Sequence, residues 1–295
     1  MAKQTKLQSF IAEEVDKVRG IYLPVRAGIF ERALVRKVKI SKLHPNPEDE
    51  FCFPDIGPNE EIVSRYEKEF RQMLDDKYAS RAMHLSASEP LEVQKIRPDG
   101  YMILNGHHRW AAAVRTGCTH QRIHILNLTQ LKDILDILRR STHDKRIVMD
   151  LDEVVLSPGP DGESEKPLRF PFRRTFKDPV RLGIPSLFSF CASRGYDVWL
   201  YSSGYRSVDY IRELLGLHRA PVTGIITETA RKTPQQSKET EALMNAKYVR
   251  TIHVDNEAVL CVDNQTKEFR EYPLNRTALW SAEVMDVMRK VSQDA

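Results

Sequence analysis

The hydrophobic positions in the first half of the chain follow two spacings, one typical of helices and one typical of strands. Helical stripes place an apolar side chain every three or four positions, whereas short alternating runs predict strands. A Pro-Asp-Gly turn at residues 98–100 joins two such runs. Gly117 closes the helix that follows, because a left-handed cap favours glycine. Helices are predicted in residues 6–18, 59–74, 107–117 and 130–140, and strands after residue 35, on both sides of the turn and in residues 122–128.

Beyond the polar stretch at residues 141–145, strand-like and helical segments alternate. Strands that alternate with helices favour a parallel sheet covered on both faces. The sequence therefore predicts an α/β protein of two domains, residues 1–142 and 143–295, and 295 residues are enough for two cores. In the second half, strands are predicted in residues 147–152, 197–203, 224–230 and 248–255, and helices in residues 184–194, 205–216, 234–246 and 280–291.

Composition excludes some classes of protein. The 45 basic and 41 acidic residues leave a net charge of +4, which does not by itself indicate a nucleic-acid binder. A basic cluster at Arg169, Arg173, Arg174 and Lys177 is either a solvated loop or a face that binds anions. No long apolar run or export signal stands out, so we expect a cytoplasmic protein without a membrane partner. The four scattered cysteines predict neither a zinc site nor a disulfide framework.

Two carboxylates follow the most apolar predicted strand. Asp150 and Asp152 are separated by one leucine, and residues i and i+2 of a strand share a face. Both side chains would then point into the crevice beyond the carboxyl ends of the strands, where they repel each other unless a cation neutralises them. A hard, oxygen-loving ion such as Mg²⁺ fits this role. One carboxylate could attack a phosphoryl group while the other moves protons.

The segment from Asp150 to Val154 resembles the first motif, Asp-x-Asp-x-(Thr or Val), of the haloacid dehalogenase (HAD) superfamily. The resemblance implies a Rossmann-like domain without a large cap, in which Asp150 is the nucleophile and Asp152 the acid/base. It also implies a serine at the end of a later strand, which is Ser202, with Ser203 as a rival.

The same resemblance implies a basic residue that neutralises phosphate and an acidic residue that completes the metal site. Lys232 is the candidate for the first, with Arg231 and Lys238 as competitors. Asp255 is the candidate metal ligand, together with Asp150 and Asp152. Two departures leave the complete ligand set open: Asn256 stands where a second aspartate is common, and Asp263 is farther away than usual.

A second polar cluster opens the helix predicted at residues 107–117. Backbone N–H groups and the dipole at a helix start favour anions, and arginine adds a two-pronged donor. This cluster, the NGHHR box, is therefore a candidate phosphate-binding corner. Alternatively, the two histidines only satisfy the helix start; shared metal binding is disfavoured because adjacent helical positions diverge. The box consists of Asn105, Gly106, His107, His108 and Arg109.

The NGHHR box and the segment from about residue 35 to residue 128 resemble the ParB/sulfiredoxin-like superfamily. The resemblance implies an N-terminal α+β domain that binds ATP or another nucleotide. The box contains no cysteine, which disfavours sulfiredoxin chemistry. Glu60 and Glu61 are either acidic helpers or residues that complement a helix dipole.

The leading hypothesis is a magnesium-dependent phosphatase that forms an aspartyl-phosphate intermediate and carries an N-terminal nucleotide- or phosphate-binding domain. Its partner would be a phosphorylated substrate, small or macromolecular. One alternative is a bifunctional kinase and phosphatase whose N-terminal domain uses ATP or ADP on a small molecule. Another is a non-catalytic regulator that binds nucleic acid, which would show salt-sensitive binding.

Overall fold

The computed structural model describes residues 6–74, 86–158, 162–229, 234–275 and 279–293. The chain divides into two compact units, residues 1–127 and 128–295, each with a mixed α/β architecture. Each unit builds one sheet of six strands from the described residues. Among the residues that the structure describes, no helix is both long and apolar enough to cross a membrane.

The first unit is built on the sheet order β2-β6-β4-β5-β3, with β1 paired to the far end of β4. The antiparallel hairpin of β4 and β5 confirms the two strands predicted around the turn at residues 98–100. Gly100 has φ +99°, and a Cβ there would lie 2.5 Å from the carbonyl oxygen of Lys42, so the turn requires glycine. The strands are β1 (Leu23–Pro24), β2 (Arg36–Lys39), β3 (Leu43–His44), β4 (Leu91–Arg97), β5 (Tyr101–Asn105) and β6 (His120–Ile125).

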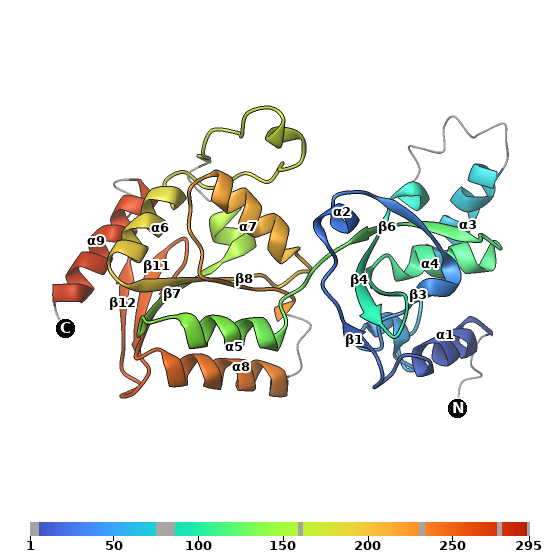
Figure 1. Cartoon of the computed structure of the whole chain (residues 1–295), viewed down its shortest axis with the longest axis horizontal. Coiled ribbons are helices and arrows are strands. Elements are labelled where there is room, and N and C mark those ends of the chain that lie inside the picture. The colour runs from blue at the N-terminus through green and yellow to red at the C-terminus, as the bar shows by residue number, and fades with distance from the viewer. Residues whose placement is uncertain (1–5, 75–85, 159–161, 230–233, 276–278, 294–295) are drawn as a thin grey trace. The chain divides into compact units, whose positions relative to one another are not determined.

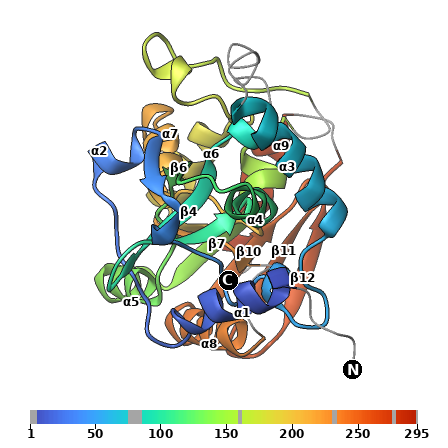
Figure 2. The same cartoon turned by 90° about the vertical axis from the view of Figure 1, so that its right-hand side faces the viewer.

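Three amphipathic helices form the core of this unit together with the strands of its sheet, and Figures 1 and 2 show α3 beside α4. Trp110 and the three alanines that follow it are fully buried on α4, where small side chains allow close packing. The helices predicted in residues 6–18, 59–74 and 107–117 are thus confirmed. The helices are α1 (Lys6–Asp16), α2 (Ile29–Arg32), α3 (Glu60–Leu74) and α4 (His107–Arg115), with short 3-10 turns at Ile40–Lys42, Glu50–Cys52 and Ser86–Ser88.

The sheet of the second unit has the order β12-β11-β10-β7-β8-β9. Strands β10, β7, β8 and β9 are parallel, which confirms the parallel sheet expected from the alternation of strands and helices. Strands β11 and β12 extend it antiparallel at one edge. Their bounds are β7 (Lys145–Asp150), β8 (Tyr196–Tyr201), β9 (Gly224–Ile226), β10 (Arg250–Val254), β11 (Ala258–Asp263) and β12 (Phe269–Pro273).

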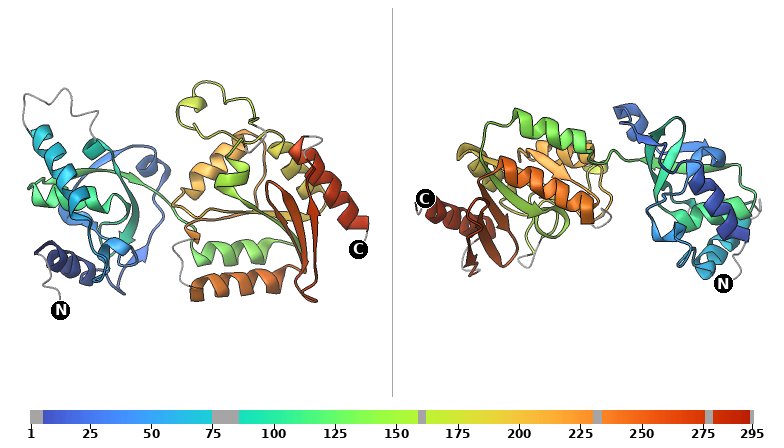
Figure 3. Two further views of the ribbon diagram at one scale, coloured as in Figure 1. Left: turned by 180° about the vertical axis from the view of Figure 1, so that it is seen from behind. Right: turned by 90° about the horizontal axis from the view of Figure 1, so that it is seen from below.

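Helices cover both faces of this sheet, because successive strand residues point to opposite sides. Ile147 and Val198 face the core shared with α6, α7 and α9, whereas Trp199 faces α5 and α8. Figures 1 and 3 show α5 in green beside α8 in orange. The helices are α5 (Leu131–Arg140), α6 (Ile184–Ser193), α7 (Val208–Leu217), α8 (Pro234–Lys247) and α9 (Trp280–Gln293), with a π-turn at Leu151–Val155 and a 3-10 turn at Phe172–Arg174.

The boundary between the units lies before α5, which corrects the boundary predicted after residue 142. Ile134 and Leu138 of α5 are buried in one cluster with Trp199 and Met244 of the second unit. Thr129 also donates its hydroxyl to the carbonyl oxygen of Ile225 at 2.7 Å. The amphipathic pattern of α5 shows that one face is buried, but not which core it covers.

Candidate functional site

The carboxyl ends of β7, β8 and β10 bring three of the predicted site residues to one edge of the sheet. Val254 of β10 pairs with Met149 of β7, so Asp255 and Asp150 each directly follow a residue of this pair. Asp150 pairs with Tyr201, so Ser202 follows on the other side. The chain runs from β7 outward to β8 and β9 and then returns to β10 on the opposite side of β7. This reversal is a topological switch point, where ligands bind in open α/β sheets.

Asp150 is held in one orientation by the chain that follows it. One of its carboxylate oxygens accepts hydrogen bonds from the backbone N–H groups of Asp152 and Glu153, both at 2.7 Å. These bonds cap the π-turn, a rare conformation that is frequent at functional sites. No donor among the described residues contacts the other oxygen of Asp150. Among the described residues, that oxygen therefore remains available to a ligand.

Asp152 is bonded through both of its carboxylate oxygens. The hydroxyl of Ser202 donates to Oδ2 at 2.6 Å. Arg206 donates to Oδ1 through Nε at 2.9 Å and forms an ion pair with the same oxygen through a terminal nitrogen at 2.7 Å. Ser202 is fully buried, whereas its rival Ser203 is exposed. Of the two serines, only Ser202 reaches the carboxylate pair.

Arg206 joins the carboxylate pair to a residue from a distant loop. Its guanidinium lies 3.6 Å from the carboxylate of Asp178, in addition to its contacts with Asp152. Burial alone would lower the pKa of Arg206, but the two carboxylates outweigh burial and raise it. Neither Arg206 nor Asp178 was expected from the sequence. The signal for Arg206 was its position in the loop that follows Ser202 and precedes α7.

Asp255 and Asn256 form the turn between β10 and β11. Asp255 is exposed, and one of its carboxylate oxygens accepts the N–H of Asn256 at 2.6 Å. The side chain of Asn256 accepts a hydrogen bond from Arg181 at 2.5 Å and donates to the carbonyl oxygen of Glu153 at 3.4 Å. The amide of Asn256 therefore connects three loops at this edge of the sheet.

Asp263 lies at the other end of the sheet. It pairs with Arg250, the first residue of β10, whereas Asp255 follows the last residue of that strand. Five residues separate these ends, or about 15 Å of strand. Asp263 therefore cannot share a ligand with Asp255.

The described residues contain no group of three or more histidine, cysteine, aspartate and glutamate side chains that could hold a metal ion. Asp150 and Asp255 still place carboxylate oxygens at neighbouring strand ends, and such oxygens suit Mg²⁺, which commonly takes one or two protein carboxylates and completes its shell with water and phosphate. Lys232 and its competitor Arg231 lie outside the described residues. Lys238 is exposed on α8.

The two histidines of the NGHHR box accept hydrogen bonds from loops of their own unit. His107 is buried, and its Nε2 accepts the N–H of Asn46 at 3.2 Å. His108 accepts the N–H of Asn59 at 3.1 Å through the same atom, and burial lowers its pKa. An imidazole that accepts through Nε2 at this site is neutral. These contacts agree with the alternative in which the histidines serve the local structure.

The rest of the box is also bonded within the unit. Arg109 is buried and donates to Glu89 at 3.3 Å and to the carbonyl oxygen of Pro90 at 3.4 Å. Asn105 donates to Glu92 at 3.2 Å. Gly106 begins α4 with φ +99°, a conformation that favours glycine. The box therefore has a defined geometry even without a ligand.

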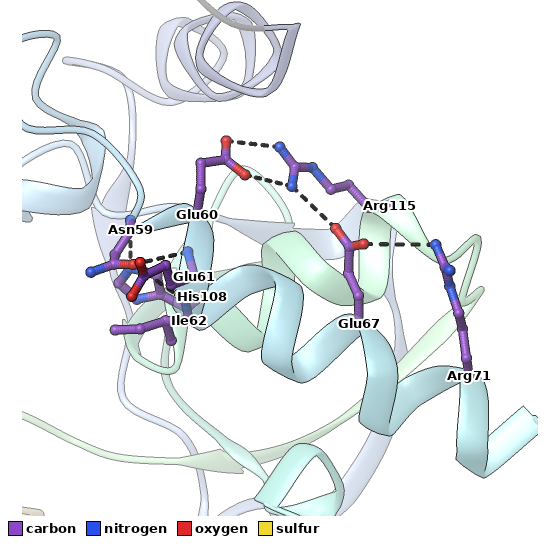
Figure 4. Close-up of polar contacts among 8 residues, drawn as sticks. All are labelled: Asn59, Glu60, Glu61, Ile62, Glu67, Arg71, His108 and Arg115. Carbon is purple, nitrogen blue, oxygen red and sulfur yellow. Dashed lines mark hydrogen bonds and ion pairs between the residues drawn. The ribbon is translucent and has the colours of Figure 1, made fainter.

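The start of α3 lies against this box, as Figure 4 shows. Asn59 caps the helix by accepting the N–H groups of Glu61 and Ile62 at 3.0 and 3.2 Å. Glu60 forms two hydrogen bonds with Arg115, at 2.7 and 2.9 Å. Glu60 thus joins α3 to α4, a structural role that the sequence alone did not distinguish from that of an acidic helper.

Comparisons with known proteins add little to this geometry. No family model matches the chain, and no curated protein matches it. Among solved structures, the C-terminally truncated chromosome-partitioning protein ParB from Caulobacter crescentus, complexed to the centromeric parS site, is similar over 35% of this chain. The similarity covers 48% of the ParB chain, about half of its length, at 24% identity and a TM-score of 0.22.

Proposed function

We propose that the chain is a magnesium-dependent phosphatase of the HAD type, whose first unit is a ParB/sulfiredoxin-like domain that binds a nucleotide or another phosphate. The observation that carries the phosphatase assignment is the group of Asp150, Asp152 and Ser202 at the switch point of a parallel sheet. One oxygen of Asp150 is fixed by backbone N–H groups while the other is left for a substrate.

In the proposed reaction, the free oxygen of Asp150 attacks the phosphorus of a phosphomonoester. The bond between phosphorus and the ester oxygen breaks, and the leaving oxygen takes a proton from Asp152, which must enter this step protonated and exchange one of its hydrogen bonds to donate. Asp152 then takes a proton from water while the water oxygen attacks phosphorus. The bond between phosphorus and Asp150 breaks, and inorganic phosphate is released.

Besides Asp150 and Asp152, four residues support this reaction without exchanging protons with the substrate. Ser202 and Arg206 hold the carboxylate of Asp152 in place. Asp150 and Asp255 would hold the magnesium ion, which when bound supplies positive charge to the phosphoryl oxygens. Lys232 is proposed to neutralise the same oxygens, as the HAD resemblance implies.

Nucleotide binding by the first unit is a separate part of the proposal. Its support is the position of the NGHHR box at the start of α4, where backbone N–H groups face outward from the helix. A nucleotide phosphate would compete with Glu89 for Arg109. Calorimetric titration of the full chain with ATP tests this part, and an Arg109→Gln variant should weaken any binding that is found.

The test of the phosphatase is phosphate release from para-nitrophenyl phosphate by the full chain. We expect release that is abolished by EDTA and restored by magnesium. The Asp150→Asn variant should lose at least about a thousandfold in rate, because it lacks the nucleophile. Its circular dichroism spectrum should match that of the wild type.

Asp263→Asn is the matched control, because it makes the same chemical change at the opposite end of the sheet. Its rate should equal that of the wild type. Equal rates in the wild type and Asp150→Asn would overturn the assignment of the nucleophile.

A further inference from the structure

A basic and aromatic loop extends from the second unit next to the candidate site. This loop, residues 162–181, is called the flap here and is the yellow-green segment that contains the small 3-10 turn in Figure 1. Its base is fixed by two backbone hydrogen bonds, from Arg181 to Val155 at 2.9 Å and from Glu165 to Val180 at 2.7 Å. Because Val155 ends the π-turn that begins after Asp150, the base of the flap is anchored to the site itself.

The outer part of the flap carries a concentration of positive charge. Between residues 166 and 178 the only acidic residue is Asp178, which contacts Arg206. The cations are all exposed, and none forms an ion pair with another residue that the structure describes. Unpaired cations so close together repel one another, so an anion bound there would be stabilised. They are Lys166, Arg169, Arg173, Arg174 and Lys177.

Two aromatic rings lie exposed among these cations. The relative exposure of Phe170 is 67% and that of Phe172 is 47%. The guanidinium of Arg174 lies 5.1 Å from the ring centre of Phe170. A solvated loop would gain nothing from exposed phenylalanine, since leaving such rings in water costs free energy. The rings therefore offer a flat apolar surface to a partner.

The C-terminal part of the flap connects it to the candidate site. Phe176 packs against Tyr210 of α7, with ring centres 5.1 Å apart, and the N–H of Lys177 donates to the hydroxyl of Tyr210 at 3.1 Å. Asp178 then contacts Arg206, which binds Asp152. A chain bound along the flap would thus be held beside the carboxylates.

We infer that the flap binds single-stranded nucleic acid, so that the substrate of the proposed phosphatase is a nucleic-acid end that carries a terminal phosphate. Proteins that bind single strands combine cations, which contact the backbone phosphates, with aromatic rings on which bases stack. An acidic phosphopeptide would also be attracted by the cations, but it would give no role to Phe170 and Phe172. This inference rests on the proposed phosphatase for its substrate, while binding by the flap is independent of catalysis.

The binding test uses fluorescence anisotropy of the full chain with a fluorescein-labelled oligothymidylate that carries no terminal phosphate. A Phe170→Ala/Phe172→Ala variant should bind at least about tenfold more weakly, because it removes both rings on which bases would stack. An Arg173→Gln/Arg174→Gln variant should lower the slope of log affinity against log salt by about 1.4.

The matched control is Arg140→Gln/Lys290→Gln, which removes two exposed cations from α5 and α9. Its affinity should equal that of the wild type. If the two flap variants also bind like the wild type, the inference is overturned. It is likewise overturned if a labelled phosphopeptide binds as tightly as the oligonucleotide and the phenylalanine variant does not weaken it, since the partner would then be a protein.

An activity test separates this inference from the proposed function. The flap variants should lose at least about tenfold in kcat/KM on an oligonucleotide with a terminal phosphate and keep their rate on para-nitrophenyl phosphate. Normal rates on both substrates would overturn the inference and leave the phosphatase intact. Flap-dependent binding without phosphate release from either substrate would overturn the phosphatase and support the flap as a nucleic-acid surface.

Discussion

The NGHHR box and the Asp150 to Val154 segment occupy similar positions at the ends of strands but differ in what surrounds them. Each places polar residues where a strand turns into a helical segment. In the box, both imidazoles accept backbone N–H groups and Arg109 is buried against Glu89. In the second segment, the free oxygen of Asp150 has no donor among the described residues, and it lies at a switch point of the sheet.

This difference teaches that residue type and spacing do not decide whether a polar cluster is a site. What decides is whether the rest of the domain already satisfies the hydrogen bonds of the cluster, because a group that is already bonded must exchange partners to bind a ligand. The box has its partners, whereas the carboxylate segment keeps one oxygen available. Changes in the box should therefore alter stability first, and changes in the carboxylate segment should alter chemistry first.

The largest expected effect is on catalysis by Asp152. An Asp152→Asn variant should lose about a hundredfold to ten-thousandfold in the rate of hydrolysis of an alkyl phosphate, because the leaving oxygen no longer receives a proton. The loss should be smaller on para-nitrophenyl phosphate, whose leaving group needs no proton. Steady-state kinetics on both substrates measure this contrast.

An equal loss on the two substrates would contradict the role of Asp152 as the acid that protonates the leaving oxygen. It would leave the role of Asp152 toward water or a structural role through Ser202 and Arg206. An unchanged hydrogen-exchange pattern in β7 would show that the variant keeps its local fold.

The next effect is on the stability of the first unit. A Gly106→Ala variant should destabilise it by about 2–4 kcal/mol, because alanine is strained at φ +99° and its Cβ would lie 2.5 Å from a methyl carbon of Leu91. Hydrogen exchange of peptides from α4 in the full chain should accelerate. Peptides from β7 and phosphate release should stay unchanged, and a loss of phosphate release with stable α4 peptides would break the distinction between the two regions.

The elements of both regions could be predicted from the sequence because their signals are local. The apolar run before Asp150 and the hairpin before Gly106 are each set by neighbouring residues. The contacts that distinguish the two regions are not local. Arg206 reaches Asp152 across 54 positions, and the N–H of Asn46 reaches His107 across 61. Periodicity contains no information on such pairs, since they depend on how the elements pack.

The same limit explains the displaced domain boundary. The apolar stripe of α5 was identified correctly, but a stripe fits any complementary surface. Only the packing of Ile134 and Leu138 with Trp199 assigns the helix to the second unit. Likewise, the sequence showed the cations of the flap but not that they lack partners or that Asp178 connects this loop to Arg206.

The smallest expected effect is a dependence of stability on pH in the first unit. Burial lowers the pKa of His108 below its ordinary value of 6.5, so the folded unit favours the neutral imidazole. Above about pH 6.5 both states are neutral and the full stability is present. Below that pH the unfolded state binds a proton more readily, so stability falls as the pH falls toward the lowered pKa. The slope is at most about 1.4 kcal/mol per pH unit for one proton.

A His108→Gln variant removes this proton while leaving a side chain that can accept the N–H of Asn59. Its hydrogen-exchange protection in α3 and α4, corrected for intrinsic exchange rates, should depend less steeply on pH below 6.5 than that of the wild type. His44 of the same unit is a second partly buried imidazole with a lowered pKa, so part of the dependence should remain. An unchanged slope would mean that the folded unit protonates His108 as readily as the unfolded chain does, so the hydrogen bond from Asn59 would not keep the imidazole neutral. The box would then resemble the carboxylate segment more closely than its contacts indicate.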